Sequence, residues 1–256
     1  MSTKVAIVTG ASQGIGRSTA IRLARDFESI VLVARNRVNL EETASMVGQA
    51  GAKALAIDID LALPDAAQKV VERALAGFGR IDALLNIAGA VPQIDLFDMT
   101  DEQWDAGLAL KLHGARRLTV AAWAALKEAS GSVVLMSGNS ALFPKAPYAA
   151  VGTINAAIVA LAKAFSDRGI ADGVQVNSVL PGPVMTGRRR SYLEHWAPLH
   201  DMTVEEATTR FPAEAGIARY GTPDEIAELM AFLVSPAAKW MTGSTLRMDG
   251  GEVKSV

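Results

Sequence analysis

The chain of 256 residues contains no cysteine, and its aromatic residues make up only 5%. Without cysteine it cannot form disulfides, Cys-ligated zinc sites or iron–sulfur clusters, and it has no thiol nucleophile. The 25 Lys and Arg residues nearly balance the 27 Asp and Glu residues, which argues against a dedicated nucleic-acid-binding surface. No uninterrupted apolar run reaches the roughly 18–20 residues that a membrane span requires. Because the N-terminal residues MSTKVAIVTG lead directly into a predicted strand, we expect no signal peptide and a cytoplasmic protein.

Short β-branched runs alternate along the chain with longer segments whose apolar residues recur at helical spacing. The runs VAIVT and IVLVA are apolar throughout, which is typical of a parallel sheet covered by helices on both faces. The alternation predicts one domain over residues 1–256, with an α/β Rossmann-type fold: a three-layer, doubly wound parallel sheet of about seven strands. The predicted strands are Val5–Thr9, Ser29–Ala34, Ala54–Asp58, Ala83–Asn86, Ser132–Ser137, Gln175–Leu180 and Thr245–Met248. The predicted helices are 14–26, 39–50, 64–77, 101–128, 147–168 and 223–234.

Residues 181–212 interrupt this alternation with a loosened pattern. A compact domain rarely keeps so long an excursion unless it covers a site, so we interpret the segment as a substrate lid. A pair of short helices that only fill the surface is the alternative. The segment contains His195, Trp196 and His200, and its basic run Arg188–Arg190 hints at an anionic substrate.

A glycine-rich turn, TGASQGIG at residues 9–16, directly follows the first predicted strand. Gly10 permits a tight turn, Gly14 lets the backbone approach a pyrophosphate, and Gly16 lets the next helix pack close to the sheet. The free N–H groups at the start of that helix would face the phosphates. A plain structural turn is the alternative, but the position at a strand–helix junction favours a dinucleotide site.

Four motifs in this order resemble those of the short-chain dehydrogenase/reductase family. They are TGASQGIG, the NIAG of Asn86–Gly89, the Pro181–Gly182 turn, and Met241–Gly243 together with Asp249–Gly251. The resemblance implies a nicotinamide-dinucleotide-dependent oxidoreductase that assembles as a homotetramer or homodimer. It also implies a set of cofactor contacts: Gly10, Ser12, Gln13, Gly14, Ile15, Gly16, Asp58, Ile59, Asn86, Ala88, Gly89, Pro181, Gly182, Val184 and Thr186.

The end of the second predicted strand indicates which dinucleotide is used. A carboxylate there would accept hydrogen bonds from the 2′-hydroxyl of NAD and would repel the 2′-phosphate of NADP. The family's NAD users carry the acid at the position of Ala34, and Arg35 follows it directly. Because a guanidinium matches a phosphate, we expect NADP(H) to be preferred with Arg35 as the main determinant, and NAD(H) to be a second candidate. A solvated surface arginine is the alternative.

The family's catalytic Tyr-x-x-x-Lys pair is absent from this chain. Aligning the long helix instead puts Val151 at the family's Tyr position and Asn155 at its Lys position. The same alignment puts Gly138 at the family's Ser position. Lys111 stands where the family has Asn, so Lys and Asn have exchanged places between two helices. We expect the exchange to keep an ammonium and an amide near the nicotinamide ribose; the alternative is that both residues drifted in a site that no longer reacts.

A hydroxyl for proton transfer has three sources in this neighbourhood. Tyr148 lies on nearly the same helix face as Asn155 but one turn before Val151, the family's Tyr position. The alternative is that Tyr148 is a surface residue at the start of the helix. Ser137 and Ser140 flank Gly138 and could orient a carbonyl group. The candidate catalytic residues are therefore Lys111, Ser137, Ser140, Tyr148 and Asn155, and Lys111 and Asn155 are also candidate cofactor contacts.

The sequence thus predicts an NADP(H)-dependent oxidoreductase that interconverts an alcohol and a ketone or aldehyde by hydride transfer. A catalytically silent NADP-binding sensor or scaffold of the same fold is the alternative, favoured by Gly138, Val151 and Asn155. The expected partners are a small carbonyl or alcohol substrate and further copies of the chain, with no nucleic acid and no membrane. No His and carboxylate residues have metal-ligand spacing, so no metal site is predicted.

Overall fold

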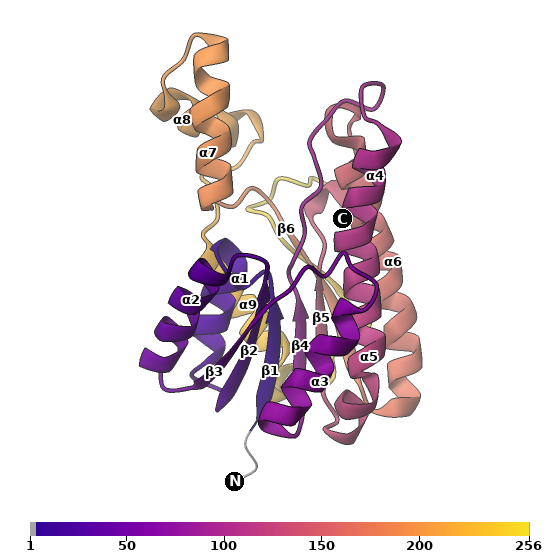
Figure 1. Ribbon diagram of the computed structural model, residues 1–256. Helices are drawn as coiled ribbons and strands as arrows, with labels where there is room; N and C mark the ends of the chain where they lie inside the picture. The colour runs from indigo at the N-terminus through magenta and orange to yellow at the C-terminus, as the bar shows by residue number, and fades with distance from the viewer. Residues whose placement is uncertain (1–3, 256) are drawn as a thin grey trace.

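Seven parallel strands form the sheet of the computed structural model, which describes residues 4–255 (Figure 1). Their spatial order is β3-β2-β1-β4-β5-β6-β7, which confirms the predicted doubly wound sheet. The strands are β1 Val5–Thr9, β2 Ser29–Ala34, β3 Lys53–Asp58, β4 Ala83–Asn86, β5 Ser132–Met136, β6 Gln175–Pro181 and β7 Thr245–Met248. Each of them begins and ends within one residue of its predicted bounds. The order reverses at β1, so a crevice lies beyond the carboxyl ends of β1 and β4.

Alternate residues of β1 enter two separate hydrophobic cores. Val5 and Ile7 pack with α3 (Ala66–Phe78), α5 (Ala115–Glu128) and α6 (Ala149–Asp172). Ala6 and Val8 pack on the other face, with α1 (Gly14–Leu23), α2 (Arg37–Gln49) and α9 (Pro223–Leu233). Because both faces are buried, the strands have no polar side, which explains their continuous apolar sequences.

Helix α6 is long and apolar enough to cross a membrane by length and composition alone. Its residues Ile154, Ile158 and Ala162 are buried, and the helix packs against β5 and β6. This position in the core accounts for its apolar character.

The helix predicted over 101–128 is divided into three parts. These are α4 (Asp101–Gly107), a π-helical segment η1 (Leu108–Gly114) and α5. A π-helical segment inserts an extra residue into the helical turn and is frequent at functional sites. Lys111 lies at the middle of this segment, so the irregular backbone decides where its side chain points.

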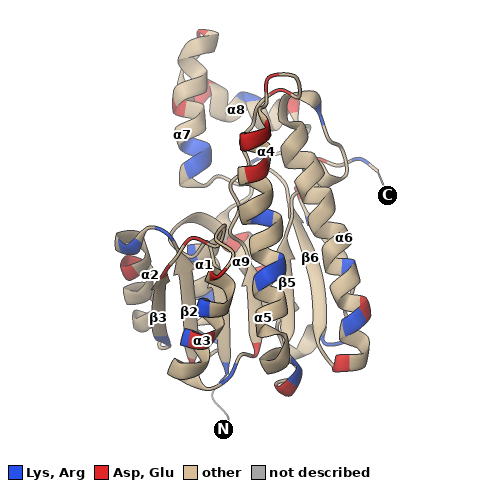
Figure 2. Cartoon of the chain, turned by 45° about the vertical axis from the view of Figure 1, so that its right-hand side comes forward, with Lys and Arg blue, Asp and Glu red and all other residues tan. Residues whose placement is uncertain are grey.

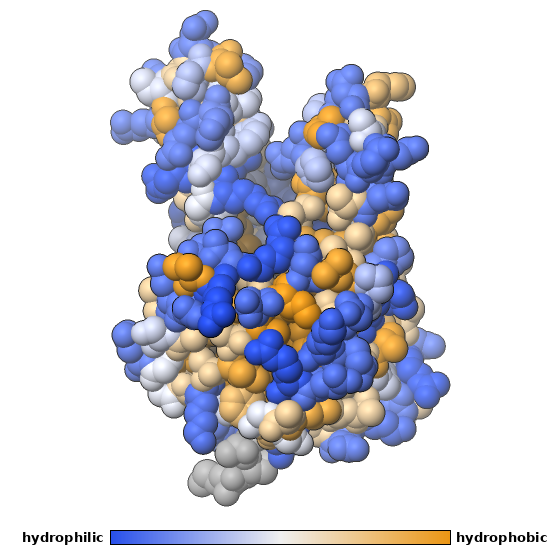
Figure 3. All heavy atoms as spheres, viewed as in Figure 1, coloured by the Kyte–Doolittle hydropathy of each residue, from blue (hydrophilic) through white to orange (hydrophobic). Residues whose placement is uncertain are grey.

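The segment predicted as a loosened excursion forms two helices with a turn between them. The helices are α7 (Gly187–Trp196) and α8 (Val204–Glu214), with the short turn η4 (Ala197–His200) between them, and they stand above the carboxyl edge of the sheet (Figure 1 and Figure 2). We call residues 185–220 the helical hairpin. It has a small core of its own, formed by Leu193, Ala197, Ala207 and Tyr220 with surrounding apolar residues. The surface is hollowed between the hairpin and the part of the molecule that carries α4 (Figure 3).

Candidate active site

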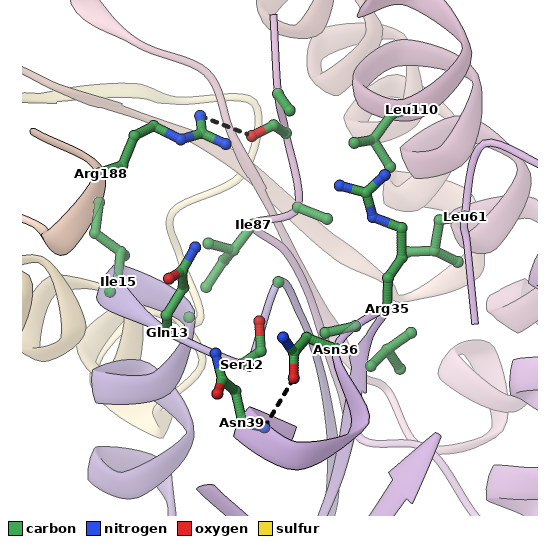
Figure 4. Close-up of a pocket in the computed structure, with 18 of the residues that line it drawn as sticks. Ser12, Gln13, Ile15, Arg35, Asn36, Asn39, Leu61, Ile87, Leu110 and Arg188 are labelled. Carbon is green, nitrogen blue, oxygen red and sulfur yellow. Dashed lines mark hydrogen bonds between the residues drawn. The ribbon is translucent and has the colours of Figure 1, made fainter. Parts of the chain in front are cut away.

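A cavity of about 750 Å³ lies at the carboxyl ends of β1, β2 and β4 (Figure 4). Eleven of the predicted cofactor contacts line it: Gly10, Ser12, Gln13, Gly14, Ile15, Gly16, Arg35, Ile59, Ala88, Gly89 and Thr186. Its other lining residues were not predicted as contacts: Val33, Ala34, Asn36, Asn39, Asp60, Leu61, Ile87, Ala90, Leu110, Met136, Gly187 and Arg188. Five of these, Asn36, Asp60, Leu61, Ile87 and Ala90, follow the ends of parallel strands, which is the signal that could have identified them.

The glycine-rich turn has the backbone that a phosphate cradle needs. Gly10 and Gly14 have backbone φ angles of +68° and +55°, which residues other than glycine rarely adopt. A Cβ on Gly16 would lie 2.1 Å from the carbonyl oxygen of Gly10, so only glycine fits there. The turn therefore leaves the cavity floor bare next to the first N–H groups of α1, and a dinucleotide's pyrophosphate fits this arrangement.

The start of α7 lies opposite the start of α1. A Cβ on Gly14 would lie 3.4 Å from Cγ2 of Thr186, the residue whose hydroxyl caps α7. Arg188, in the first turn of α7, points into the cavity and donates from Nη1 to the carbonyl oxygen of Gly89 at 3.3 Å (Figure 4). Two helix N-termini and a guanidinium thus face one part of the cavity, where they favour an anionic group.

Arg35 lines the same cavity near the end of β2 (Figure 4). Its guanidinium Nη1 lies 3.8 Å from Oδ2 of Asp60, and 66% of the side chain is exposed. The neighbouring Asn36 caps α2 by accepting a hydrogen bond from the N–H of Asn39 at 3.0 Å. The residue before Arg35 is Ala34, so no carboxylate ends this strand. The arrangement suits a 2′-phosphate better than a 2′-hydroxyl.

Seven predicted cofactor contacts do not line the cavity: Asp58, Asn86, Lys111, Asn155, Pro181, Gly182 and Val184. Asp58 is exposed at the end of β3, and Asp60 lines the cavity instead. Asn86 is buried and donates from Nδ2 to Oγ1 of Thr119 at 3.1 Å, a bond that joins β4 to α5. Val184 pairs with Gly221 in an isolated parallel bridge at the base of the helical hairpin.

The side chains of Lys111 and Asn155 meet directly beside the cavity. Lys111 donates from Nζ to Oδ1 of Asn155 at 2.5 Å and to the carbonyl oxygen of Ser137 at 3.2 Å. Asn155 in turn donates from Nδ2 to Oγ of Ser140 at 2.8 Å. Lys111 and Asn155 therefore belong to one hydrogen-bonded network, which we call the Lys111 network: Lys111, Asn155, Ser137 and Ser140.

Gly138 accommodates this network. A Cβ at this position would lie 2.6 Å from Nδ2 of Asn155, which is closer than real Cβ contacts. A side chain at position 138 and the present placement of Asn155 are thus sterically incompatible, because the amide occupies the space that this side chain would need.

The two candidate serines have different roles in the network. Ser137 donates its hydroxyl hydrogen to the carbonyl oxygen of Asn155 at 2.7 Å, so that hydrogen is already engaged. Ser140 accepts from Asn155, and within residues 4–255 its own hydroxyl hydrogen has no acceptor, so it can bond to another group. Tyr148 is half-buried directly before α6, and its hydroxyl has no hydrogen-bond partner within residues 4–255. Val151, one turn further on, is half-buried and offers no polar group.

Burial lowers the pKa of Lys111 from 10.5 to about 8, and the positive charge of Arg188 acts in the same direction. Both effects disfavour the charged ammonium. A lysine with this pKa exchanges its proton near neutral pH, as a general acid or base must.

The comparisons with known proteins agree with this geometry. The chain matches the family model described as enoyl-(acyl carrier protein) reductase over residues 10–252. It is 31% identical to the short-chain reductase protein NovJ of Streptomyces niveus over 247 residues, which covers 96% of this chain and 93% of the relative. It is 30% identical to a 3-oxoacyl-(acyl-carrier-protein) reductase of Synechocystis sp. over 256 residues, or 99% and 98% of the two chains.

Among solved structures, the L-sorbose reductase of Gluconobacter frateurii, complexed with NADPH and L-sorbose, superposes with a TM-score of 0.95 at 28% identity. The match covers 100% of this chain and 98% of that one. An actinorhodin polyketide ketoreductase variant with NADPH superposes with a TM-score of 0.93 at 28% identity, covering 99% and 98%. The chain belongs to the short-chain dehydrogenase/reductase family and is an oxidoreductase of the CH–OH/C=O class. The expectation of NADP(H) agrees with the NADPH held in both of these structures.

Proposed function

We propose that the protein is an NADP(H)-dependent oxidoreductase that interconverts an alcohol and a ketone or aldehyde. The observation that carries this proposal is the contact between the dinucleotide cavity and the Lys111 network. Gly89 lines the cavity, and a Cβ there would lie 3.0 Å from Cδ of Lys111. The proton donor and the cofactor cavity thus adjoin each other. When bound, the cofactor supplies the hydride.

Different lining residues bind different parts of the cofactor. Gly10, Gly14 and the N-terminus of α1 receive the pyrophosphate, helped by Arg188 from α7. Arg35 receives the 2′-phosphate. The NADPH in the L-sorbose reductase and ketoreductase structures supports this choice of dinucleotide.

The Lys111 network provides the proton chemistry. The free hydroxyl hydrogen of Ser140 orients the substrate carbonyl by hydrogen bonding to its oxygen. In the reduction direction the Lys111 ammonium transfers a proton to that oxygen, becomes neutral, and later takes a proton from solvent. Asn155 keeps the ammonium and the hydroxyl in a fixed relation, because its amide bonds to both. Ser137 holds the backbone of Asn155 in place.

The proposal is tested by NADPH fluorescence titration, combined with NADPH oxidation over a panel of aldehydes and ketones. Binding with turnover of at least one carbonyl compound is the expected result. Binding without any turnover would favour the silent sensor or scaffold, for which Val151 is the main argument. Absence of NADPH binding would overturn both.

The helical hairpin acts as the substrate lid. It joins the rest of the chain at a narrow base, where the N–H of Met185 donates to Gly221 and the N–H of Gly221 donates to Pro183, both at 2.9 Å. Its helices pack mainly on one another and on η4. Limited proteolysis checks this role, since bound cofactor is expected to slow cleavage within 185–220.

Assembly as a homodimer or homotetramer uses α5 and α6. Ala124 of α5 and Ala156 and Ala160 of α6 are exposed, and small residues let helices approach closely. Light scattering at micromolar concentration checks the assembly, and monomeric behaviour would contradict it.

A further inference from the structure

A carboxylate from the C-terminal segment reaches the loop that carries the Lys111 network. Oε2 of Glu252 accepts a hydrogen bond from Nδ2 of Asn139. Asn139 lies between Gly138 and Ser140, both of which contact the Asn155 side chain. Glu252 therefore contacts the residue that directly precedes Ser140, although no sequence motif included it.

The segment that carries Glu252 is fixed by several hydrogen bonds. The carboxylate of Asp249 accepts from the N–H groups of Gly251 and Val253, each at 3.0 Å. Lys254 donates from Nζ to the carbonyl oxygens of Gly216 at 3.1 Å and Gly251 at 2.5 Å. The contact of Lys254 with Gly216 ties the segment to the helical hairpin, two residues beyond Glu252.

The Glu252 carboxylate is half-buried and incompletely paired. The charged groups facing it are Asp249, Lys145 and Arg189, and within residues 4–255 none of them forms an ion pair with it. Arg189 is engaged elsewhere, because its guanidinium stacks on the rings of Tyr192, Phe211 and Tyr220. Burial raises the pKa of Glu252, whereas its hydrogen bond with Asn139 lowers it. The carboxylate can thus accept further hydrogen bonds, and its position is poorly solvated.

We propose that Glu252 is a specificity residue, which binds a hydrogen-bond donor at the far end of the substrate and so selects substrates carrying an ammonium or hydroxyl group there. A carboxylate at the same end of the substrate would be repelled. This inference rests on the proposed carbonyl chemistry. It differs from the anionic substrate suggested by Arg188–Arg190: Arg188 faces the dinucleotide cavity and Arg189 is stacked on aromatic rings.

The test uses four acetophenones that differ only at the para position: aminomethyl, hydroxymethyl, methyl and carboxylate. Binding to the protein saturated with NADP⁺ is measured by calorimetry or saturation-transfer NMR, so that the readout does not depend on turnover. The wild-type protein is expected to bind the aminomethyl compound at least about tenfold more tightly than the carboxylate compound, with the hydroxymethyl compound between them.

Glu252→Gln is expected to reduce this ratio to about twofold or less while leaving the affinity of the methyl compound unchanged. Glu252→Asp, which keeps the charge but shortens the side chain, is expected to give an intermediate ratio. Glu194→Gln changes an exposed glutamate of α7 and is the matched control, expected to keep the wild-type ratio. Thermal melting of each variant verifies that it is folded.

Equal affinity across the series in the wild-type protein would overturn the inference. So would an unchanged ratio in Glu252→Gln, or absence of binding for all four compounds. NADPH titration in the same samples separates this failure from that of the proposed function: lost NADPH binding overturns the latter, whereas intact binding without substituent dependence overturns only the role of Glu252.

Discussion

Nζ of Lys111 lies 2.5 Å from Oδ1 of Asn155, although the two residues are 44 positions apart in the chain. From the family resemblance we expect each of them to occupy the place where the family pattern has the other's residue type. An ammonium in either position can bond to an amide in the other. Two lysines would repel each other, and two amides would leave the pair without a cation. The contact couples the two residues directly, as the proposed proton chemistry requires.

Lys111→Asn and Asn155→Lys are each expected to lower the turnover of a carbonyl substrate by about 100-fold or more, the usual contribution of a general acid. The double variant restores an ammonium–amide pair with its anchoring points reversed. We expect it to be at least about tenfold more active than either single variant, because the coupled residues are not additive. Steady-state kinetics measure this.

NADPH affinity is the control for these three variants. It is expected to stay within about threefold of the wild-type value, since neither residue lines the dinucleotide cavity. Full turnover in Lys111→Asn would remove Lys111 as the proton donor.

The pH dependence of reduction follows from the Lys111 pKa of about 8. A lysine with a lowered pKa is mostly protonated at pH 7 and mostly neutral at pH 9, so it can donate a proton only on the acid side. We expect kcat/KM for reduction to fall as pH rises through 8, and kcat/KM for alcohol oxidation to rise over the same interval. Profiles measured in both directions check this, and a reduction rate that does not change between pH 7 and 9 would contradict it.

Arg35→Ala is expected to raise the Kd of NADPH by about tenfold and to leave that of NADH nearly unchanged, because only NADPH carries the 2′-phosphate. The matched control is Arg37→Ala, since Arg37 is exposed nearby and pairs with Glu41 at 2.8 Å. Fluorescence titration of the wild-type protein and both variants with NADPH and NADH measures these dissociation constants. Equal losses for NADPH and NADH would show that Arg35 holds a shared part of the cofactor.

The sheet could be predicted from the sequence because each strand is a continuous apolar run bounded by turn residues. The helix covering 101–128 could not be divided correctly, since the π-helical segment around Lys111 depends on tertiary packing rather than on residue periodicity. The two helices of the hairpin were anticipated only as the alternative interpretation of residues 181–212, and their bounds were not predicted. Their apolar residues Leu193, Ala197 and Ala207 form a small local core, and the amphipathic pattern over each helix is short.

The glycine-rich turn of residues 9–16 could be predicted from the sequence because no other residue type adopts its positive φ angles and fits its close backbone contacts. The exchange of Lys111 and Asn155 stays a prediction from the family resemblance, whereas the structure supplies their direct hydrogen bond. Glu252 gave no signal, because a charged residue near a chain end is normally solvated. Only the folded chain places it against Asn139.

Asp172 joins two helices on one face of the sheet. Its carboxylate, at the end of α6, accepts hydrogen bonds from Trp123 at 2.8 Å, Lys127 at 2.7 Å and Arg168 at 2.8 Å. These bonds hold the pKa of Asp172 well below its usual range, with Lys127 contributing most. Asp172→Asn is expected to lower the melting temperature by several degrees at pH 7, whereas Asp167→Asn, an exposed change on α6, is expected to have little effect.

The stability that Asp172 contributes depends on pH in a defined direction. Because its pKa is lowered in the folded state, the contribution is complete above the unfolded value of about 3.9 and is lost as pH falls below it. The difference in melting temperature between the wild-type protein and Asp172→Asn is therefore expected to shrink below pH 4. A difference that grows on acidification would contradict this.

Gly138→Ala tests whether the glycine is required by the Lys111 network. The new Cβ would lie 2.6 Å from Nδ2 of Asn155, so the amide must move and its hydrogen bond with Ser140 must lengthen or break. We expect turnover to fall by about tenfold, since small displacements of positioned groups are costly in catalysis, with NADPH affinity unchanged. Gly48→Ala, where nothing lies within 4 Å of the added carbon, is the control and is expected to keep full activity. If Gly138→Ala keeps wild-type turnover, the asparagine amide does not need its present position, and the network's role in proton transfer is wrong.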